Sequence, residues 1–154
     1  FNSNSVFLSI VCVDELVSPV GTVKCIGNQW YWTYEYGGIG LKFDSYMIWP
    51  GDGEFGYLRL LEVEIDYLPV RVPFRIIVTS SDVIHSWSVP AFGIKLDGVP
   101  GRLNQVSFYG MRVGFFFGQC SEMCGVNHAF MPIMVEVVTV RDFINFLNFQ
   151  KVNS

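Results

Sequence analysis

Hydrophobic and polar residues alternate along much of this chain. Residues 61–66 alternate aliphatic with acidic side chains, residues 70–76 alternate aliphatic or aromatic with basic ones, and residues 133–137 alternate around a glutamate. A period of two with one buried face predicts antiparallel strands packed on one side. Pro73 within the second pattern indicates an edge strand or a bulge. Further strands are expected at residues 22–26, 30–36, 102–109 and 113–118.

Only the C-terminal end has a helical pattern. Phe143, Phe146 and Leu147 fall on one helix face, and Thr139 with Asp142 can form an N-terminal capping box. Short strands separated by glycine- and proline-rich turns indicate a sandwich or barrel. The sequence therefore predicts an all-β, Greek-key β-sandwich or barrel over residues 21–139, followed by a short C-terminal helix and tail over residues 140–154.

The composition excludes some classes of protein. The 154 residues suit one domain, and 51% of them are hydrophobic, which excludes intrinsic disorder. A net charge of −4 argues against binding to nucleic acid. Charged residues make up 16% of the chain, below the share of about 25% in ordinary soluble domains. We therefore expect partner proteins to cover much of the exterior.

The longest apolar run is too short to cross a membrane. It spans residues 6–13 and stops at Asp14 and Glu15, whereas a membrane helix needs about 20 apolar residues. It also lacks the basic start and the cleavage site of a signal peptide. We interpret residues 1–20 as the end of a membrane-proximal segment and a linker, with no spanning segment in this chain.

The candidate chemistry is concentrated in residues 120–131. This stretch holds Cys120, Cys124, His128 and Met131, and the other histidine of the chain, His85, lies well upstream. Thiolate, thioether and imidazole together favour copper. Two thiolates can bridge a pair of coppers, each with one histidine, while the methionine and a backbone carbonyl near position 122 complete the set. Such a pair shares the transferred electron, so bond lengths change little and transfer is fast.

Three other interpretations of these residues stay open. Two cysteines and two histidines can hold zinc, and Cys120 could form a disulfide with Cys124 in an oxidising compartment. A cysteine with a histidine could also be a nucleophile and its base. The methionine and the β context favour copper over zinc, and no orienting acid or oxyanion motif accompanies a nucleophile in the sequence. Cys12 and Cys25 fit no motif.

Four segments together carry a family resemblance. They are residues 29–36, 80–90, 100–105 and 118–133. They resemble the dinuclear copper (CuA) domain of cytochrome c oxidase subunit II, and the resemblance extends from about residue 14 to residue 138. It implies a cupredoxin-like fold with two copper ions. The ligands that it implies are His85, Cys120, Cys124, His128, Met131 and the backbone carbonyl of Glu122. It also implies that the Glu122 side chain reaches a magnesium ion shared with subunit I.

The resemblance further implies a role in respiratory electron transfer. Trp30 would receive electrons from cytochrome c, and Trp30, Tyr31 and Asp82 would belong to the docking surface. Charged surfaces of this kind raise the encounter rate more than the affinity. Electrons would pass to the haem of subunit I, where oxygen is reduced, so the oxygen chemistry is not in this chain. A metal-handling sandwich that serves assembly is the second functional class that we keep.

Two features separate this chain from similar families. It retains the copper ligands that the corresponding subunit of quinol oxidases lacks, and it has Glu122 where nitrous oxide reductase has an aromatic residue. Members of the resembled family usually begin with two membrane helices. We therefore expect this chain to be the C-terminal half of a divided subunit II, with those helices on a separate chain of a membrane-associated complex; a truncated sequence is the alternative. The expected location is the intermembrane-space side of the mitochondrial inner membrane, with the bacterial periplasmic face as the alternative.

Overall fold

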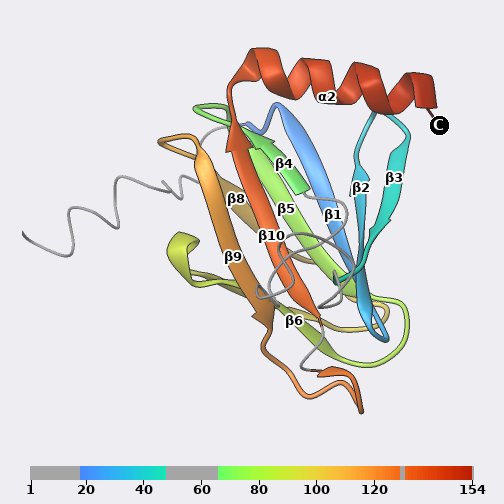
Figure 1. Cartoon of the computed structure of the whole chain (residues 1–154). Coiled ribbons are helices and arrows are strands. Elements are labelled where there is room, and N and C mark those ends of the chain that lie inside the picture. Colours follow the sequence, from blue (N-terminus) through green and yellow to red (C-terminus); the bar gives the residue numbers. More distant parts are fainter. Residues whose placement is uncertain (1–17, 48–65, 129–130, 154) are drawn as a thin grey trace, which may run out of the picture.

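The computed structural model describes residues 18–47, 66–128 and 131–153, which form a two-layered β-sandwich with a helix across one end (Figure 1). The first sheet contains, in spatial order, β3 (Leu41–Ser45), β2 (Tyr31–Tyr36), β1 (Gly21–Asn28), β5 (Phe74–Ser80) and β8 (Asn104–Phe108). The second contains β4 (Asp66–Pro69), β10 (Pro132–Val138), β9 (Gly114–Cys120), β6 (His85–Val89) and β7 (Ile94–Gly98). The remaining elements are a 3-10 turn, η1 (Pro90–Phe92), and the helix α2 (Val140–Asn153). The predicted all-β sandwich with a C-terminal helix is confirmed.

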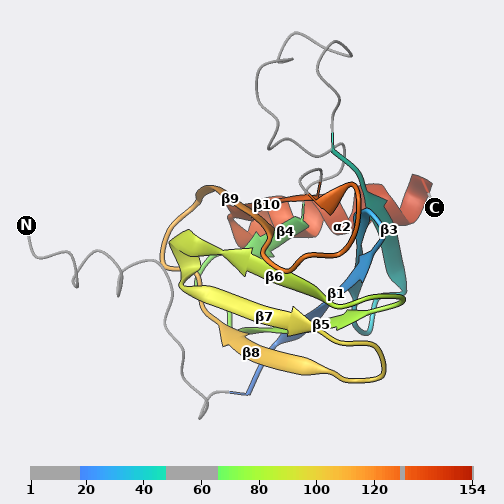
Figure 2. The same ribbon diagram turned by 90° about the horizontal axis from the view of Figure 1, so that it is seen from below.

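Both sheets are mixed, which differs from the expected antiparallel arrangement. β1 runs antiparallel to β2 but parallel to β5, and β10 runs antiparallel to β9 but parallel to β4. A period of two reports which face of a strand is buried and not the direction of its neighbour, so the pattern could not reveal this. β7 of the second sheet lies beside β8 of the first, which closes the sandwich along that side (Figure 2).

The strand predicted over residues 70–76 is wrong in its first half. β4 ends at Pro69, and Arg71 has a φ of 56°, in the left-handed region that a strand cannot contain. The Arg71 N–H donates to the carbonyl of Gly110 at 2.8 Å, so the chain turns here between β4 and β5. Pro73 precedes β5 instead of interrupting it. Of the strand predicted over residues 61–66, only the last residue lies among those described.

The core lies between the two sheets. Trp32 from β2 and Trp87 from β6 are fully buried, as are Ile76 of β5 and Val135 of β10. Burying a large apolar side chain contributes about 1.5–3 kcal/mol before the entropy cost is counted. These interlocked side chains therefore hold β6 and β9, the strands that support the candidate site, against the first sheet.

The helix α2 covers the end of the sandwich opposite the segment that follows β9 (Figure 1). Its Phe146 ring lies 4.5 Å from that of Tyr67 and 5.9 Å from that of Tyr36, measured between centroids. The N-cap half of the predicted capping box is confirmed, because the Asp142 N–H donates to Thr139 Oγ1. The Asp142 carboxylate accepts from the Thr139 hydroxyl, whereas in a full capping box it accepts from the backbone N–H of the N-cap residue. Among the described residues, no helix is long and apolar enough to cross a membrane. The predicted membrane-proximal segment lies almost entirely outside the described residues.

Candidate metal centre

Two neighbouring strands bring the candidate ligands to one end of the second sheet. β6 and β9 are antiparallel, with Trp87 opposite Cys120, so the start of β6 and the end of β9 coincide. His85 is the first residue of β6 and Cys120 is the last of β9. The backbone N–H of Cys120 donates to the carbonyl of Met131 at 3.0 Å, which closes the intervening loop on itself. Residues far apart in the sequence thus meet at a fixed position.

The two cysteine sulfurs lie at the middle of the cluster, 4.0 Å apart. Cys120 Sγ lies 3.8 Å from Nδ1 of His85 and 3.4 Å from the carbonyl oxygen of Glu122. Cys124 Sγ lies 3.4 Å from Nδ1 of His128 and 3.6 Å from Sδ of Met131. Each sulfur therefore faces its own imidazole and one weaker donor. This two-sided arrangement suits two metal ions that share both sulfurs.

The donor atoms are shielded from water. His85 is fully buried, and both cysteines and Met131 are at most 5% exposed, whereas His128 is only half-buried. Glu122 is exposed to solvent, although its backbone carbonyl oxygen faces the Cys120 sulfur. A soft donor set in a dry site fits copper. Six donors also exceed the four ligands that a structural zinc ion takes.

The two cysteines are free thiols in this structure. Their sulfur separation of 4.0 Å is about twice the bond length of about 2.05 Å in a disulfide. The disulfide considered from the sequence is therefore not formed here. The sequence also suggested that no acid orients a histidine near a cysteine, and this is wrong, because Asp82 contacts His85. Cys120 is nevertheless buried, with only 5% of its surface exposed, which argues against a nucleophile that meets a substrate.

The surroundings of the two thiols shift their pKa values in opposite directions. Burial raises the pKa of Cys120, but hydrogen bonds involving His85, Ser86 and Glu122 outweigh burial and lower it to about 7. Burial and the neighbouring Cys120 raise the pKa of Cys124 to about 12. The pair therefore loses one proton near neutral pH and holds the second. Metal binding displaces such protons, because the thiolate is the form that ligates.

Asp82 and Gln29 contact two of the candidate ligands, His85 and Cys124, from outside the group of donor atoms. Asp82 Oδ1 lies 2.9 Å from Nε2 of His85, and its other oxygen accepts a hydrogen bond of 2.8 Å from the Gln29 N–H. The Gln29 side-chain amide donates to the carbonyl of Cys124 at 2.8 Å. Burial lowers the pKa of His85, yet its contacts with Cys120 and Asp82 prevail and raise it. A carboxylate on the second ring nitrogen is the usual way to orient a ligating histidine.

From the sequence, Asp82 was expected on a docking surface, and no role was predicted for Gln29. The Asp82 side chain is 34% exposed, so it faces solvent and His85 at once. The position of Asp82, three residues before His85, was the signal in the sequence that could have predicted their contact. Gln29 is 53 positions from Asp82 and 95 from Cys124, and no local pattern marked it.

Trp30 and Tyr31 lie at the start of β2, next to the loop that holds Cys124. A Cβ built on Gly125 would lie 3.2 Å from Nε1 of Trp30, so the indole packs against the residue that follows Cys124. Tyr31 stacks on Tyr46, which is 48% exposed, with ring centroids 4.6 Å apart. The two residues thus join the candidate centre to an exposed aromatic surface.

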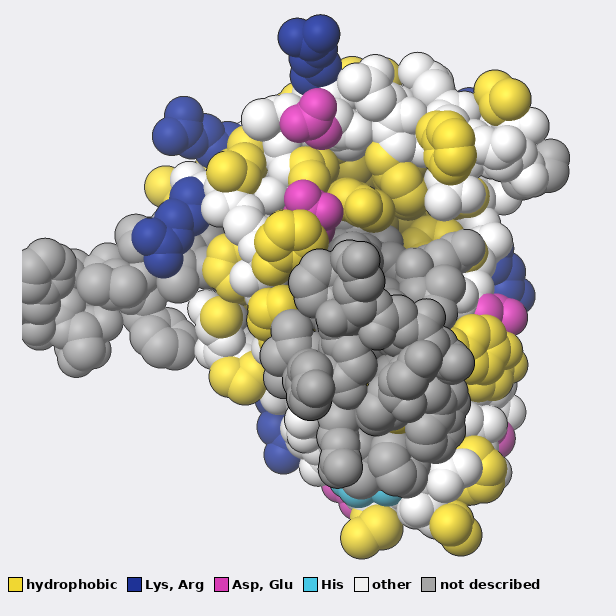
Figure 3. All heavy atoms as spheres, in the orientation of Figure 1, with side chains coloured by type: hydrophobic (Ala, Val, Ile, Leu, Met, Phe, Trp, Pro, Cys, Tyr) yellow, Lys and Arg dark blue, Asp and Glu magenta, His cyan; other side chains and the backbone are white. Residues whose placement is uncertain are grey.

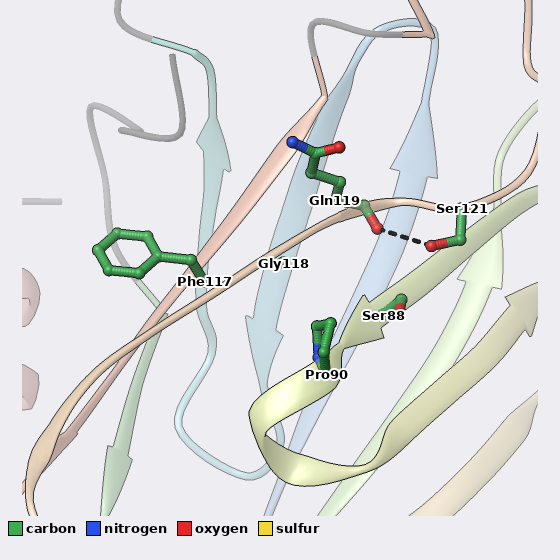
Figure 4. Close-up of a pocket in the computed structure, with 6 residues that line it drawn as sticks. All are labelled: Ser88, Pro90, Phe117, Gly118, Gln119 and Ser121. Atoms are coloured by element: carbon green, nitrogen blue, oxygen red, sulfur yellow. Dashed lines mark hydrogen bonds between the residues drawn. The ribbon is translucent and has the colours of Figure 1, made fainter. Parts of the chain in front are cut away.

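A shallow pocket lies beside this cluster without containing any of the candidate ligands (Figure 4). Its lining residues come from β6, η1, β9 and the residue after Cys120; they are Ser88, Pro90, Phe117, Gly118, Gln119 and Ser121. A Cβ on Gly118 would lie 1.8 Å from the carbonyl oxygen of Ser88, so only glycine lets β9 approach β6 this closely. The pocket is a feature of the outer surface and not part of the metal centre.

Fold and site together define a β-sandwich metalloprotein domain with a soft-donor centre at one end. A family model described as cytochrome C oxidase subunit II, periplasmic domain, matches residues 21–138. The chain therefore belongs to the cytochrome c oxidase subunit II family, of which it contains the periplasmic domain. The predicted family membership is confirmed.

Individual relatives agree with this assignment. The chain is 52% identical to cytochrome c oxidase subunit 2 of Oenothera berteroana over 150 residues, which cover 92% of the chain and 58% of the relative. It is 51% identical to the subunit named mitochondrial of Glycine max over 144 residues, covering 89% of the chain and 36% of the relative. The crystal structure of the periplasmic domain of subunit II of cytochrome oxidase of Bradyrhizobium japonicum superposes with a TM-score of 0.82 at 40% identity, covering 90% and 98% of the two chains. The chain thus spans about half the length of the longer proteins it matches.

Proposed function

We propose that this chain is the electron-transfer domain of a cytochrome c oxidase, which accepts electrons from cytochrome c at a dinuclear copper centre. The observation that carries the proposal is the pair of cysteine sulfurs, 4.0 Å apart, each of which faces its own imidazole. Soft donors of this kind select copper. The electrons would leave toward the haem of subunit I, where oxygen is reduced.

Six residues would hold the two copper ions. They are His85, Cys120, Cys124, His128 and Met131 through their side chains, and Glu122 through its backbone carbonyl. Bound copper supplies a one-electron acceptor and donor. The protein holds the donors in place and excludes water. The buried strand ends can do this because a closely packed core resists rearrangement. The exposed Glu122 side chain is free to reach a magnesium ion at the contact with subunit I.

Electron entry is assigned to Trp30 within this proposal. Its indole packs on Gly125, beside the Cys124 ligand, while Tyr31 and Asp82 lie nearby and reach solvent. The net charge of −4 supports attraction of a basic cytochrome c, since complementary charge raises association rates.

Apolar surface supports assembly with other subunits. Figure 3 shows hydrophobic side chains over the face that carries β9 and α2. Five large apolar residues in or next to these elements are at least 50% exposed: Val113 just before β9, Phe115, Ile144, Phe149 and Val152. Exposed apolar patches commonly mark interaction sites. We assign the chain to the intermembrane-space side of the mitochondrial inner membrane, because relatives in plants are named mitochondrial; the bacterial periplasmic face is the alternative.

Electron paramagnetic resonance of the oxidised, copper-loaded chain tests this function. One unpaired electron shared equally by two copper nuclei should give a hyperfine pattern from both. A pattern from a single copper nucleus, or a chain that accepts zinc but no copper, would overturn the dinuclear assignment. The second outcome would instead support the structural, metal-handling class.

A further inference from the structure

We propose that Gln29 is a positioning residue that ties the β1–β2 turn to ligands on both sides of the metal centre. This inference rests on the proposed function of the same site. The side-chain amide of Gln29 donates to the carbonyl of Cys124 at 2.8 Å. Its backbone N–H donates to Asp82 at 2.8 Å, and Asp82 contacts the His85 ring at 2.9 Å. Gln29, in the turn between β1 and β2, thus contacts the backbone of Cys124 directly and the imidazole of His85 through one carboxylate.

The bond to Cys124 differs from the other contacts of the ligand loop. Among the described residues, the other hydrogen bonds of residues 121–128 stay within the loop and its flanking strand ends, or join Ser121 to Ser86 on β6. They therefore link the loop only to its own sheet. The Gln29 amide links the loop to the first sheet, and so fixes the loop's middle relative to the body of the sandwich.

The neighbour of Gln29 contacts the same part of the loop. Trp30 packs against Gly125, whose φ of 126° lies in a region that residues other than glycine rarely adopt. A Cβ on Gly125 would also lie 3.1 Å from the Gln29 amide nitrogen. The dipeptide Gln29–Trp30 therefore holds the dipeptide Cys124–Gly125 through one hydrogen bond and one aromatic contact.

Only a donor of the right length can serve this function. A carbonyl accepts hydrogen bonds and cannot donate one, so its partner must carry an N–H or O–H group. Glutamate has the length of glutamine, but its ionised carboxylate has no hydrogen to donate and would face the carbonyl oxygen. Gln29→Glu therefore removes the bond with almost no change of shape, and Gln29→Ala removes it without adding charge.

The first experiment uses the full chain loaded with copper. Loss of an outer partner of a metal ligand typically weakens metal binding by about 10–100-fold. We expect Gln29→Glu and Gln29→Ala to release copper to a chelator about 10-fold faster or more, and to make the two copper hyperfine couplings unequal. Gln105→Glu is the matched control, because it makes the same chemical change at an exposed position of β8. Wild-type release rates and spectra in both Gln29 variants would overturn the proposal.

The second experiment needs no metal and separates this inference from the proposed function. In the metal-free chain, the carbonyl ¹³C resonance of Cys124 should shift in Gln29→Ala and stay unchanged in Gln105→Glu, while the His85 ring ¹⁵N resonances should change little, because the Gln29 backbone N–H that contacts Asp82 is retained. An unshifted Cys124 resonance in Gln29→Ala would overturn the positioning role. If the wild-type chain shows no shared-electron spectrum, the proposed function fails, while a shifted Cys124 resonance would still support the positioning of Cys124 by Gln29.

Discussion

Asp82 and His85 are joined by a 2.9 Å contact between Oδ1 of the carboxylate and Nε2 of the ring. His85 is fully buried, while the Asp82 side chain is 34% exposed, so the pair connects the centre with the protein surface. Because Nε2 contacts Asp82, Nδ1 is the nitrogen that faces Cys120 and that would bind a metal in the proposed centre. The carboxylate would thereby select which ring nitrogen acts as the ligand.

Replacing Asp82 with Asn should therefore affect metal binding as well as docking. The amide keeps the shape but removes the negative charge that holds the Nε2 proton. We expect copper affinity to fall by about 10-fold or more, which competition with a chelator would measure. Asp44→Asn is the control, since Asp44 is an exposed acid on β3 whose bonding partner is Thr33 and not a candidate ligand. Equal affinities in both variants would leave Asp82 with a surface role alone.

Replacing Cys124 with Ser should abolish the dinuclear centre. Serine provides no thiolate, so the two coppers lose one of their shared ligands while Cys120 and His85 remain. The shared-electron hyperfine pattern and the near-infrared charge-transfer band should disappear. Cys25→Ala is the matched control, because Cys25 is buried in β1 outside the cluster. A Cys124→Ser variant with wild-type spectra would refute the assignment of this residue.

Most of the centre could be predicted from the sequence because most of its donors are close together in the chain. Cys120, Cys124, His128 and Met131 fall within one loop, and only His85 had to be added from another strand. The contacts of Gln29 depend on how the two sheets pack, which no local spacing reveals. The positions of the donors agree with the prediction, while their roles as copper ligands stay predictions.

The strands were predicted from alternation of hydrophobic and polar residues in the sequence. β1 was found by this signal, and β10 was found from its alternation around Glu136, although six of its seven residues are buried. β6 was missed although its two serines alternate with Trp87 and Val89, because it is only five residues long. β3 and β7 do alternate and were overlooked because they are short. The turn at Arg71 interrupts an alternating pattern through backbone conformation, which side-chain character does not report.

Asp66 should make the stability of the protein depend on pH. It is fully buried, and burial raises its pKa to about 7, although the hydrogen bond that Tyr36 donates at 2.6 Å opposes this. The native state thus holds this proton more tightly than the unfolded chain, where the pKa is near 3.8. The stabilisation is complete below about pH 4 and is lost as the pH rises through about 7, by up to about 4 kcal/mol.

Denaturant unfolding of the metal-free chain across this pH range measures the effect. Asp66→Asn keeps a partner for the Tyr36 hydroxyl but cannot ionise, so its unfolding free energy should vary less between pH 4 and 7 than that of the wild type. Asp97→Asn, at an exposed position of β7, should retain the wild-type dependence. Parallel curves for wild type and Asp66→Asn would show that Asp66 is ionised in the native state.

The N-cap residue Thr139 should stabilise the helix α2 without affecting the metal centre. Thr139→Ala removes the acceptor of the Asp142 N–H and should cost about 1 kcal/mol. Because α2 lies at the end of the sandwich opposite the ligand loop, the copper spectrum should not change. Thr139→Ser retains the hydroxyl and is the control. Chemical denaturation together with electron paramagnetic resonance of each variant measures both effects, and a changed spectrum would show that the two ends are coupled.

Gly27 on β1 should be indispensable to the position of His85. A Cβ at this position would lie 2.6 Å from Cδ2 of the His85 ring, closer than any real contact, so Gly27→Ala must displace the ring or the strand. His85 is fully buried, and moving it would break its alignment with both Asp82 and Cys120. We expect the variant to bind less copper and to lose the symmetric spectrum. Gly37→Ala is the control, because its nearest neighbour would be Thr22 at 3.3 Å, away from the ligands. If Gly27→Ala folds and binds copper as the wild type does, the ring can be accommodated elsewhere, and the tight packing of β1 on His85 is not required for the centre.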